Sequence, residues 1–589
     1  MTLFDPAMPF VLLDDARAGA ATPARLFSAP LDSIVAHDAA DVPAALAAAR
    51  AALAAGHHLA GHIGYEAGLG LEPRLAPLAP TPAGSPLLWL GVFGPPALLD
   101  RPALSALLGD PAGAWAGTPQ PRVTEADYCT AVERLLAYIA AGDIYQANYT
   151  FRADVAVAGS PMALYAGLRG AGGGGWGGIV HGGGNWLLSF SPELFFTLAE
   201  GQLTARPMKG TAPAGSDPDA LRSDAKQRAE NLMIVDLIRN DLSRVAQAGS
   251  VAVPSLFEVE CYPTVNQMTS TVTASLRDGL DPIDVIAALF PCGSVTGAPK
   301  IRAMELIAAL ELDSRGAYTG AIGYLGPDGS AAFNVAIRTL AITDGDNRAV
   351  MGLGSGVVAD SRPEAEWREC LAKGAFVTAG ATRFDLVETM KFDSKAGLLL
   401  LETHLGRLKA SAQALGFACD RHAIRNELQA ATFRLMTDSR VRMRLSPTGA
   451  VAIEVTALPE SPFLADIALA RRPVTRDDFR LRHKTSDRHF YDEARRTGGA
   501  FEVVLIDEDG FVTEGSFTNI FVERGDTLVT PPLARGLLPG VLRTTLIEEG
   551  RAVEGELTPA DLAGEFLIGN ALRGLIPARL VAGAKEAGL

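Results

Sequence analysis

The sequence predicts an α+β protein with two domains, spanning residues 1–378 and 384–589. With 589 residues the chain is longer than a single hydrophobic core usually supports. The sequence texture changes over residues 374–383, and a new series of helices and strands begins at Phe384. Helical periodicity marks several segments before this boundary and consecutive strands follow it, so both helices and strands are expected; the α+β arrangement itself is implied by the family resemblances of the motifs.

The composition is that of a folded protein that avoids nucleic acid. Hydrophobic residues make up 48% of the chain and charged residues 20%, without a long polar tract. The net charge of −15 and the pI near 5.2 oppose the basic surface that binding to a phosphate backbone requires. Local groups of Lys and Arg are therefore informative, because they can bind an anionic small molecule against the overall field.

The cysteines and the N-terminus indicate a soluble cytoplasmic protein. The five cysteines are scattered and form no C-x-x-C pair, so neither a disulfide framework nor a zinc site is expected. The N-terminal residues include Asp5, Asp14 and Asp15 and show no basic-then-apolar signal. No segment is long and apolar enough to predict a membrane span, since Arg50 interrupts the Ala-rich stretch near residues 44–56.

Three helices are predicted before the boundary. Thr124 is a candidate N-cap, apolar residues follow at helical spacing, and Gly142 is a candidate stop. The second helix lies within residues 224–249, with Leu232, Val235, Ile238 and Leu242 on one face, and the third spans residues 363–374.

Two other stretches of the first part are interpreted as connections. Residues 73–121 are rich in Pro, Ala and Gly and lack sustained periodicity, so we expect loops or connecting strands there. Residues 170–178 are mostly glycine, but they lack the Gly-Lys-Ser/Thr ending of a phosphate loop, so a flexible hairpin tip is expected.

After the boundary, consecutive strands are expected to form an antiparallel meander. Their predicted order is residues 503–507, a turn at 508–510, then 511–514 and 519–522.

Acidic side chains on two helices suggest a divalent-cation site. Glu366, Glu369 and Lys373 are spaced i, i+3 and i+7, which places them on one helix face, and Glu230 lies on the preceding predicted helix. Carboxylates that converge from two helices suit Mg²⁺, which commonly binds protein carboxylates together with an anionic ligand. A solvated helix face explains the same spacing, so the pattern leaves both interpretations open.

A series of short motifs is spread over residues 1 to about 378. They are Gly142-Asp-Ile-Tyr-Gln146, Ser191-Pro-Glu-Leu-Phe195, Arg206-Pro-Met-Lys-Gly-Thr211, Asn231 to Asp241, Gly293-Ser-Val-Thr-Gly-Ala-Pro-Lys300, Ala336-Ile-Arg-Thr339 and Gly352-Leu-Gly-Ser-Gly356. In this order they resemble the motifs of the chorismate-utilising enzymes. The resemblance implies a two-sheet sandwich with outer helices, Mg²⁺ as cofactor and chorismate as substrate.

The resemblance assigns roles within this domain. It implies that Glu230 and Glu369, with Glu366 in or near their shell, hold Mg²⁺, and that Glu193 protonates the departing hydroxyl at C4 of chorismate. The groups that it implies for binding the chorismate carboxylates are Thr296, Gly297, Tyr318, Arg338, Gly356 and Lys373.

Three positions discriminate among members of this family. Isochorismate-forming relatives carry a Lys where this chain has Gln146, and anthranilate synthases carry Ala and His where it has Lys209 and Gln267. The resemblance thus indicates an aminodeoxychorismate synthase, in which Lys209 attacks C2 before ammonia arrives at C4. None of the cysteines lies in a glycine-flanked nucleophile turn, so ammonia is expected from a separate glutamine amidotransferase subunit.

A second series of motifs lies within residues 384–589. They are His404-Leu-Gly-Arg-Leu408, His483 to Tyr491, Thr513 to Phe521, Thr530-Pro-Pro532, Leu538-Pro-Gly-Val-Leu-Arg543 and Asn570-Ala-Leu-Arg-Gly574. They resemble class IV aminotransferase-like proteins, specifically the aminodeoxychorismate lyases. The resemblance implies pyridoxal 5'-phosphate as cofactor, and association through this domain into a homodimer is among the expectations.

The same resemblance assigns the cofactor-binding residues. Lys484 is implied as the residue that forms a Schiff base with the cofactor and moves a proton, and Glu514 as the partner of the pyridine nitrogen. Arg407 and the backbone N–H groups of Val541 and Leu542 are implied as phosphate ligands. Arg573 is the candidate for binding the substrate carboxylate.

Together these resemblances predict a bifunctional enzyme that aminates chorismate at C4 and then eliminates pyruvate to give 4-aminobenzoate. Two alternatives remain: an anthranilate-type synthase fused to a class IV transaminase, and a non-catalytic ligand-sensing scaffold. The residues Glu193, Lys209, Glu230, Glu369 and Lys484 favour the enzyme over the scaffold.

Overall fold

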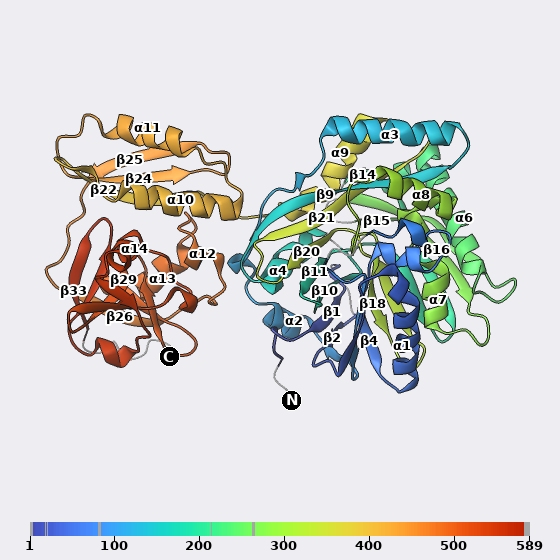
Figure 1. Cartoon of the computed structure of the whole chain (residues 1–589), viewed down its shortest axis with the longest axis horizontal. Coiled ribbons are helices and arrows are strands. Elements are labelled where there is room, and N and C mark those ends of the chain that lie inside the picture. The colour runs from blue at the N-terminus through green and yellow to red at the C-terminus, as the bar shows by residue number, and fades with distance from the viewer. Residues whose placement is uncertain are drawn as a thin grey trace. The chain divides into compact units, whose positions relative to one another are not determined.

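The computed structural model groups the chain into two compact units (Figure 1). It describes residues 4–17, 19, 22–80, 84–172, 174–213, 215–261 and 265–581. Unit 1 contains Met1–Gly109, Thr118–Val155 and Tyr165–Gly380, and unit 2 contains Asp110–Gly117, Ala156–Leu164 and Ala381–Leu589. Within the described ranges, no helix is long and apolar enough to cross a membrane.

Two large antiparallel sheets form unit 1. The main path of the first follows the order β17 (Gly297–Ala298), β9 (Gln146–Ala158), β21 (Arg348–Val357), β20 (Thr339–Thr343), β11 (Asn185–Ser189), β10 (Gly177–Gly182), β1 (Phe10–Asp14), β2 (Ala24–Phe27) and β6 (Ala97–Leu99). The second follows the order β14 (Met208–Pro213), β16 (Val265–Ser275), β13 (Gln202–Arg206), β12 (Leu194–Ala199), β19 (Ala331–Val335), β18 (Ala321–Leu325), β4 (His58–Ile63), β5 (Leu88–Phe93) and β3 (Asp32–Ala36), with β15 (Ala252–Cys261) beside β16.

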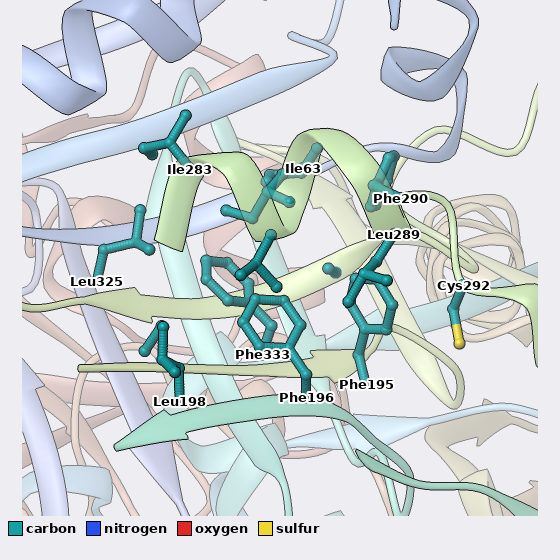
Figure 2. Packing of buried hydrophobic residues seen from close by; sticks show 14 of the residues in the cluster. Ile63, Phe195, Phe196, Leu198, Ile283, Leu289, Phe290, Cys292, Leu325 and Phe333 are labelled. Atoms are coloured by element: carbon teal, nitrogen blue, oxygen red, sulfur yellow. The ribbon is translucent and has the colours of Figure 1, made fainter. Parts of the chain in front are cut away.

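Helices cover the second sheet and bury its outer face. Figure 2 shows Ile283 and Leu289 of α7 above the rings of Phe196 and Phe333 from the sheet. The other face packs on the first sheet, because a separate apolar cluster joins strand residues of both sheets, such as Val180 and Ile322. The helices up to residue 374, which include others that contact the first sheet, are α1 (Val42–Ala54), α2 (Arg101–Leu108), α3 (Glu125–Ala140), α4 (Pro161–Gly172), α5 (Pro218–Ser223), α6 (Ala225–Ser243), α7 (Pro282–Leu289), α8 (Lys300–Leu310) and α9 (Pro363–Gly374).

The helices predicted for the first part are confirmed. The side chain of Thr124 caps α3 by accepting a hydrogen bond from the backbone of Asp127, and Asp224 caps α6 in the same way. One expected buried position is wrong, since Leu232 on α6 is 45% exposed while Ile234 is buried instead.

The two predicted connections are partly wrong. Residues 73–121 include β5, which is buried along its whole length because the apolar run Leu88–Phe93 lies between β4 and β3. The glycine-rich stretch forms no hairpin tip, since its described residues end α4 and begin β10. Glycine is needed there for packing: a Cβ atom on Gly172 would lie 2.6 Å from Cβ of Phe190, and one on Gly178 would lie 2.4 Å from the Leu12 carbonyl oxygen.

Unit 2 carries two further sheets. The smaller follows the order β23 (Gly397–Leu398), β22 (Leu386–Asp393), β24 (Ser439–Leu445) and β25 (Val451–Ala457). The larger follows the order β28 (Val512–Gly515), β27 (Glu502–Ile506), β26 (Ala465–Arg471), β33 (Gly574–Leu580), β32 (Phe566–Asn570), β29 (Asn519–Arg524), β30 (Thr527–Thr530) and β31 (Ala552–Glu554). The helices are α10 (Leu401–Leu415), α11 (Arg421–Thr432), α12 (Phe479–Arg482), α13 (His489–Gly498) and α14 (Val541–Glu548).

The predicted meander is correct in its strands and wrong in one pairing. β27 and β28 form the expected antiparallel hairpin, but β29 pairs with β30 and β32. The reason is that β27 also pairs in parallel with β26, which makes the sheet mixed and separates β28 from β29 along the strand order.

Candidate active sites

In unit 1, four elements bring together the charged residues that the sequence singled out. Lys209 lies on β14, Glu230 on α6, and Glu369 and Lys373 on α9, while Glu193 immediately precedes β12. Burial lowers the pKa of the Lys209 ammonium, the positive charge of Lys373 lowers it further, and the three carboxylates act in the opposite direction. The predicted acid, lysines and metal ligands therefore share one electrostatic environment.

The Glu193 carboxyl is buried at 5% exposure. Burial raises its pKa, while a hydrogen bond from Ser294 and the charges of Lys209 and Lys373 lower it. The hydroxyl oxygen of Ser294 lies 2.6 Å from Oε1 of Glu193. A carboxyl group whose pKa is raised by burial is suited to donate a proton near neutral pH.

The predicted metal ligands lie on α6 and α9, and each interacts with another polar or charged group of the protein. Glu369 forms an ion pair of 2.8 Å with Lys373, and Glu366 accepts a hydrogen bond of 2.8 Å from Ser361. Burial raises the pKa of Glu230. The positive charges of Lys209 and Lys226 lower this pKa, and the negative charges of Asp360 and Glu369 raise it. Within the described ranges, no three His, Cys, Asp or Glu side chains already lie close enough to hold a metal ion.

The side chains of Lys209 and Gln146 approach the backbone at Gly356 closely. A Cβ atom at Gly356 would lie 2.9 Å from Nζ of Lys209 and 3.3 Å from Nε2 of Gln146. Nε2 of Gln146 is buried without a hydrogen-bond partner in the described structure. Glycine at position 356 therefore keeps space beside the two nitrogen atoms, and an unpaired buried amide favours a polar ligand there.

The remaining predicted chorismate-binding groups are fixed by backbone contacts. The guanidinium of Arg338 donates a hydrogen bond of 2.9 Å to the Gly172 carbonyl, and its backbone has a left-handed φ of 52°. The Tyr318 ring occupies the space in which a side chain at Gly352 would lie. Thr296 accepts a backbone hydrogen bond from Asn148, and the adjacent Gly297 pairs with β9.

In unit 2, a cavity of about 390 Å³ gathers the predicted cofactor residues. Lys484, Arg407, Glu514, Val541 and Arg573 all line it. Its seven Lys and Arg residues outnumber two acidic residues, although the whole chain carries a net charge of −15. The cavity is therefore a local positive site suited to an anionic ligand. The charged lining residues are Arg407, Arg440, Arg442, Lys484, Arg488, Arg495 and Arg573, with Asp492 and Glu514.

Lys484 has the electrostatics of a nucleophile or base. It lies between α12 and α13, and its backbone carbonyl accepts a hydrogen bond of 2.8 Å from Val387 on β22. Burial, followed by the positive charge of Arg407, lowers its pKa to about 7. A substantial fraction of the amine is therefore unprotonated near neutral pH, as carbonyl chemistry requires.

Glu514 lies on the same cavity wall and is held by two hydrogen bonds. The Tyr491 hydroxyl donates to Oε1 at 2.5 Å, and the backbone N–H of Leu538 donates to Oε2 at 3.1 Å. Burial raises the pKa of Glu514 to about 7 against these two donors. A cationic nitrogen placed beside this carboxylate would keep it ionised.

Arg407 is held in place by Glu388, which the sequence analysis did not identify. Glu388 on β22 accepts hydrogen bonds of 2.9 and 2.6 Å from Arg407 and one of 2.6 Å from Nδ1 of His404. Burial raises the pKa of Glu388, but the charge of Arg407 and the hydrogen bond from His404 outweigh it and lower the value to about 2. Nε2 of His404 is buried without a partner in the described structure, and His404 lines the cavity.

The first turn of α14 supplies backbone donors to the same cavity. Gly540 precedes the helix, and a Cβ atom there would lie 1.8 Å from Oδ1 of Asn519, so this approach requires glycine. Val541 lines the cavity, whereas the Leu542 side chain packs into an apolar cluster, which leaves only its N–H group to serve a ligand. A helix N-terminus next to Arg407 suits a phosphate group.

Arg440 and Arg442 also line the cavity and were not singled out from the sequence. Both lie on β24, two positions apart, so they project from the same face of the strand. Neither guanidinium has a hydrogen-bond or ion-pair partner within the described residues, and Nε of Arg440 is buried. The guanidinium of Arg573, the predicted carboxylate ligand, instead donates to the carbonyl groups of Pro459 and Glu460 and to Oγ of Ser461.

The chain belongs to the chorismate binding enzyme family, whose model matches residues 8–379. Residues 385–581 match the model of amino-transferase class IV, so the C-terminal part is a class IV aminotransferase-like domain.

Two kinds of relative have nearly the same sequence identity to this chain. The chain is 42% identical to aminodeoxychorismate synthase component 1 from Salmonella typhimurium over 43% of this chain and 57% of the relative. It is 40% identical to anthranilate synthase component 1 from Streptomyces coelicolor over 48% and 58%, respectively. The chain thus spans somewhat more than half the length of these curated relatives. The crystal structure of anthranilate synthase component I from Streptococcus pneumoniae is 25% identical, with a TM-score of 0.51, over 64% of this chain and 94% of that chain.

Proposed function

We propose that the chain converts chorismate into 4-aminobenzoate in two steps, with amination at C4 in the first domain and elimination of pyruvate in the second. The observation that carries the proposal is the pair of reactive lysines, Lys209 and Lys484, each with a pKa lowered by burial in a separate domain. Sequence identity alone does not distinguish between the two amination reactions, because an aminodeoxychorismate synthase matches at 42% and an anthranilate synthase at 40%. Lys209 favours amination at C4, because the resemblance places Ala at this position in anthranilate synthases.

In the first step, Lys209 and Glu193 act on chorismate so that ammonia replaces the hydroxyl group at C4. The neutral Lys209 amine forms a bond to C2 as the C4–O bond breaks, and Glu193 protonates the departing hydroxyl so that it leaves as water. Ammonia then forms a bond to C4 and displaces the Lys209 amine from C2. The carboxylates of chorismate are bound by Lys373, Arg338 and the backbone around Thr296 and Gly356.

We assign the Mg²⁺ site of this step to Glu230 and Glu369, with Glu366 nearby. Burial raises the pKa of Glu230, and the negative charges of Asp360 and Glu369 add to it; this supports the assignment, because a divalent cation would stabilise the ionised carboxylate. The bound ion would neutralise the substrate dianion and the departing oxygen. Glu369 and Lys373 keep 56% and 42% of their side-chain surface exposed, so both are accessible to an ion and its ligand.

In the second step, the cavity of unit 2 would hold pyridoxal 5'-phosphate. Arg407, His404 and the first turn of α14 would bind its phosphate, and Glu514 would pair with its ring nitrogen. The cofactor supplies an electron sink for the bond that breaks. Lys484 moves the proton of the carbon that carries the amino group, and departure of the enolpyruvyl group as pyruvate leaves the aromatic ring.

The substrate of this second step is a dicarboxylate, and Arg440 and Arg442 are the guanidinium groups free to bind it. Replacing Arg442 with Ala should raise KM for supplied aminodeoxychorismate by about 10-fold or more, because a hydrogen bond to a charged group is lost. Arg444→Ala is the matched control, since Arg444 lies on the same strand but not in the cavity lining. Steady-state kinetics of 4-aminobenzoate release measures the effect, and equal KM values for both variants would contradict the assignment.

We further propose that a separate glutamine amidotransferase supplies the ammonia. The purified chain should therefore use ammonium, increasingly so as free NH₃ rises with pH, and should fail to use glutamine. Chromatography of the products with each nitrogen donor makes the comparison. Turnover supported by glutamine in a preparation free of other proteins would contradict this requirement.

Location and self-association complete the proposal. The five cysteines form no disulfide bond, which supports a reducing cytoplasm. We also propose a homodimer formed through the second domain, which would bury exposed apolar side chains such as Phe433, Met436 and Phe463, exposed by 85%, 85% and 96%. Analytical ultracentrifugation of the full chain tests the association.

A further inference from the structure

The backbone of Glu193 is fixed independently of its carboxyl group. Its N–H donates to Oγ of Ser191 at 3.2 Å, and its carbonyl accepts a hydrogen bond of 3.0 Å from Val335 on β19. Ser191 in turn donates to the Val335 carbonyl at 2.6 Å. These contacts set the position of Cα, but the carboxyl still needs a partner that sets its orientation.

That partner is Ser294, which lies on the turn Gly293–Val295 between α7 and β17. Its hydroxyl is the only hydrogen-bond partner of the Glu193 carboxyl among the described residues, at 2.6 Å from Oε1. Oε2 has no hydrogen-bond partner in the same part of the chain and is the oxygen left for a substrate. Ser294 and Glu193 are 3% and 5% exposed, so water does not compete strongly for this bond.

A third group extends the chain of hydrogen bonds. Sγ of Cys292 lies 3.2 Å from Oγ of Ser294, and the cysteine is also buried. Burial raises the pKa of the Cys292 thiol to about 12, so the group keeps its proton near neutral pH. An ionised carboxylate only accepts hydrogen bonds, so Ser294 donates to Glu193 and its oxygen is free to accept from the thiol.

The turn that carries Cys292 and Ser294 is itself anchored. Lys300 forms an ion pair of 2.8 Å with Asp241 on α6, and the buried Arg315 donates to the Val295 carbonyl at 2.9 Å. A Cβ atom at Gly293 would lie 2.6 Å from the Leu237 side chain, so the turn packs directly on α6. The Ser294 hydroxyl is therefore presented to Glu193 from a rigid support.

We propose that Ser294 is a positioning residue for the Glu193 carboxyl and that the Cys292 thiol, by donating to the serine oxygen, directs the serine proton towards that carboxyl. The proposal deepens the amination reaction and rests on the proposed function for its kinetic consequence. The hydrogen bond from Ser294 to one oxygen of the Glu193 carboxyl can be tested without measuring turnover.

The charged groups that face Glu193 set the direction of the expected change. Lys209 on β14 and Lys373 on α9 favour the ionised carboxylate, as the Ser294 hydroxyl does, whereas burial opposes it. Without the serine hydroxyl, the ionised form loses its hydrogen bond and the protonated form persists to higher pH. Without the thiol, the hydroxyl is less well directed, so a smaller change of the same sign is expected.

The test is an infrared titration of the Glu193 carboxyl in the full chain. The band of the protonated acid is identified by its absence in Glu193→Gln. In Ser294→Ala this band should persist to a pH higher by about one unit or more, because a hydrogen bond to a charged acceptor is lost. Ser294→Thr, which keeps the donor, should titrate as the parent chain does, and Cys292→Ala should show the smaller upward shift.

Kinetics separates this inference from the proposed chemistry. With free ammonia held constant at each pH, the alkaline limit of chorismate consumption should move upward in Ser294→Ala together with the infrared band, and kcat should fall more than KM rises. An unshifted band in a folded Ser294→Ala sample, or an unshifted band in Cys292→Ala if the first variant does not fold, would overturn the positioning role. A shifted band in a chain that never consumes chorismate would overturn the proposed function and leave the positioning role standing.

Discussion

Replacing Lys484 with Ala should stop the release of 4-aminobenzoate while chorismate consumption continues. The variant removes the amine whose pKa burial and Arg407 lower to about 7, and with it the group that moves the substrate proton. Loss of a positioned acid–base group commonly reduces a rate by about 10²- to 10⁴-fold. The aminated intermediate should accumulate and be detected by chromatography, and the visible absorbance of covalently bound cofactor should disappear.

Two further variants test whether the effect is specific to Lys484 and to the second step. Lys395→Ala changes an exposed lysine of the same unit and should leave both steps intact. Glu230→Ala should block chorismate consumption yet still convert supplied aminodeoxychorismate. Unchanged release from Lys484→Ala would rule out its role, and loss of chorismate consumption in that folded variant would refute the independence of the two domains.

Replacing Lys209 with Ala should slow amination at C4 by on the order of 10²-fold or more, because the group that attacks C2 is removed. Any residual turnover should shift towards attack by ammonia at C2, as in anthranilate formation. Lys209→Arg is the matched variant, since it keeps a positive charge beside Glu193 and Glu230 but carries no neutral amine. We expect both variants to fail equally when products formed from chorismate and ammonium are quantified.

The outcome of Lys209→Arg decides between two roles. If the arginine variant retains most of the activity while the alanine variant loses it, Lys209 acts through its charge and not as a nucleophile. If both variants make 4-aminobenzoate at the parent rate, the residue has no part in the reaction.

Sequence patterns predicted those parts of the fold that depend on local signals. The N-cap Thr124 and the shared helix face of Glu369 and Lys373 depend on residues near in sequence, so spacing alone locates them. The parallel pairing of β27 with β26 depends on a strand more than 30 residues earlier, and no local pattern predicts that choice.

The sites show the same division. Lys484, Glu514 and Arg407 lie in motifs that the sequence alone reveals, and the structure places all three on one cavity. Glu388 was missed because its role exists only through contacts with Arg407 and His404 on α10. Arg440 and Arg442 had a usable signal, an alternating Arg-x-Arg pattern on a strand, but the cavity that gives it meaning forms only in the folded chain.

The most direct test of the account is the identity of the product. The purified chain is supplied with chorismate, ammonium, Mg²⁺ and pyridoxal 5'-phosphate, and the aminobenzoate isomers and pyruvate are separated and quantified. The account predicts 4-aminobenzoate and pyruvate in equal amounts, with aminodeoxychorismate as the only intermediate. Formation of 2-aminobenzoate, or of no aminobenzoate from a folded chain, would contradict it.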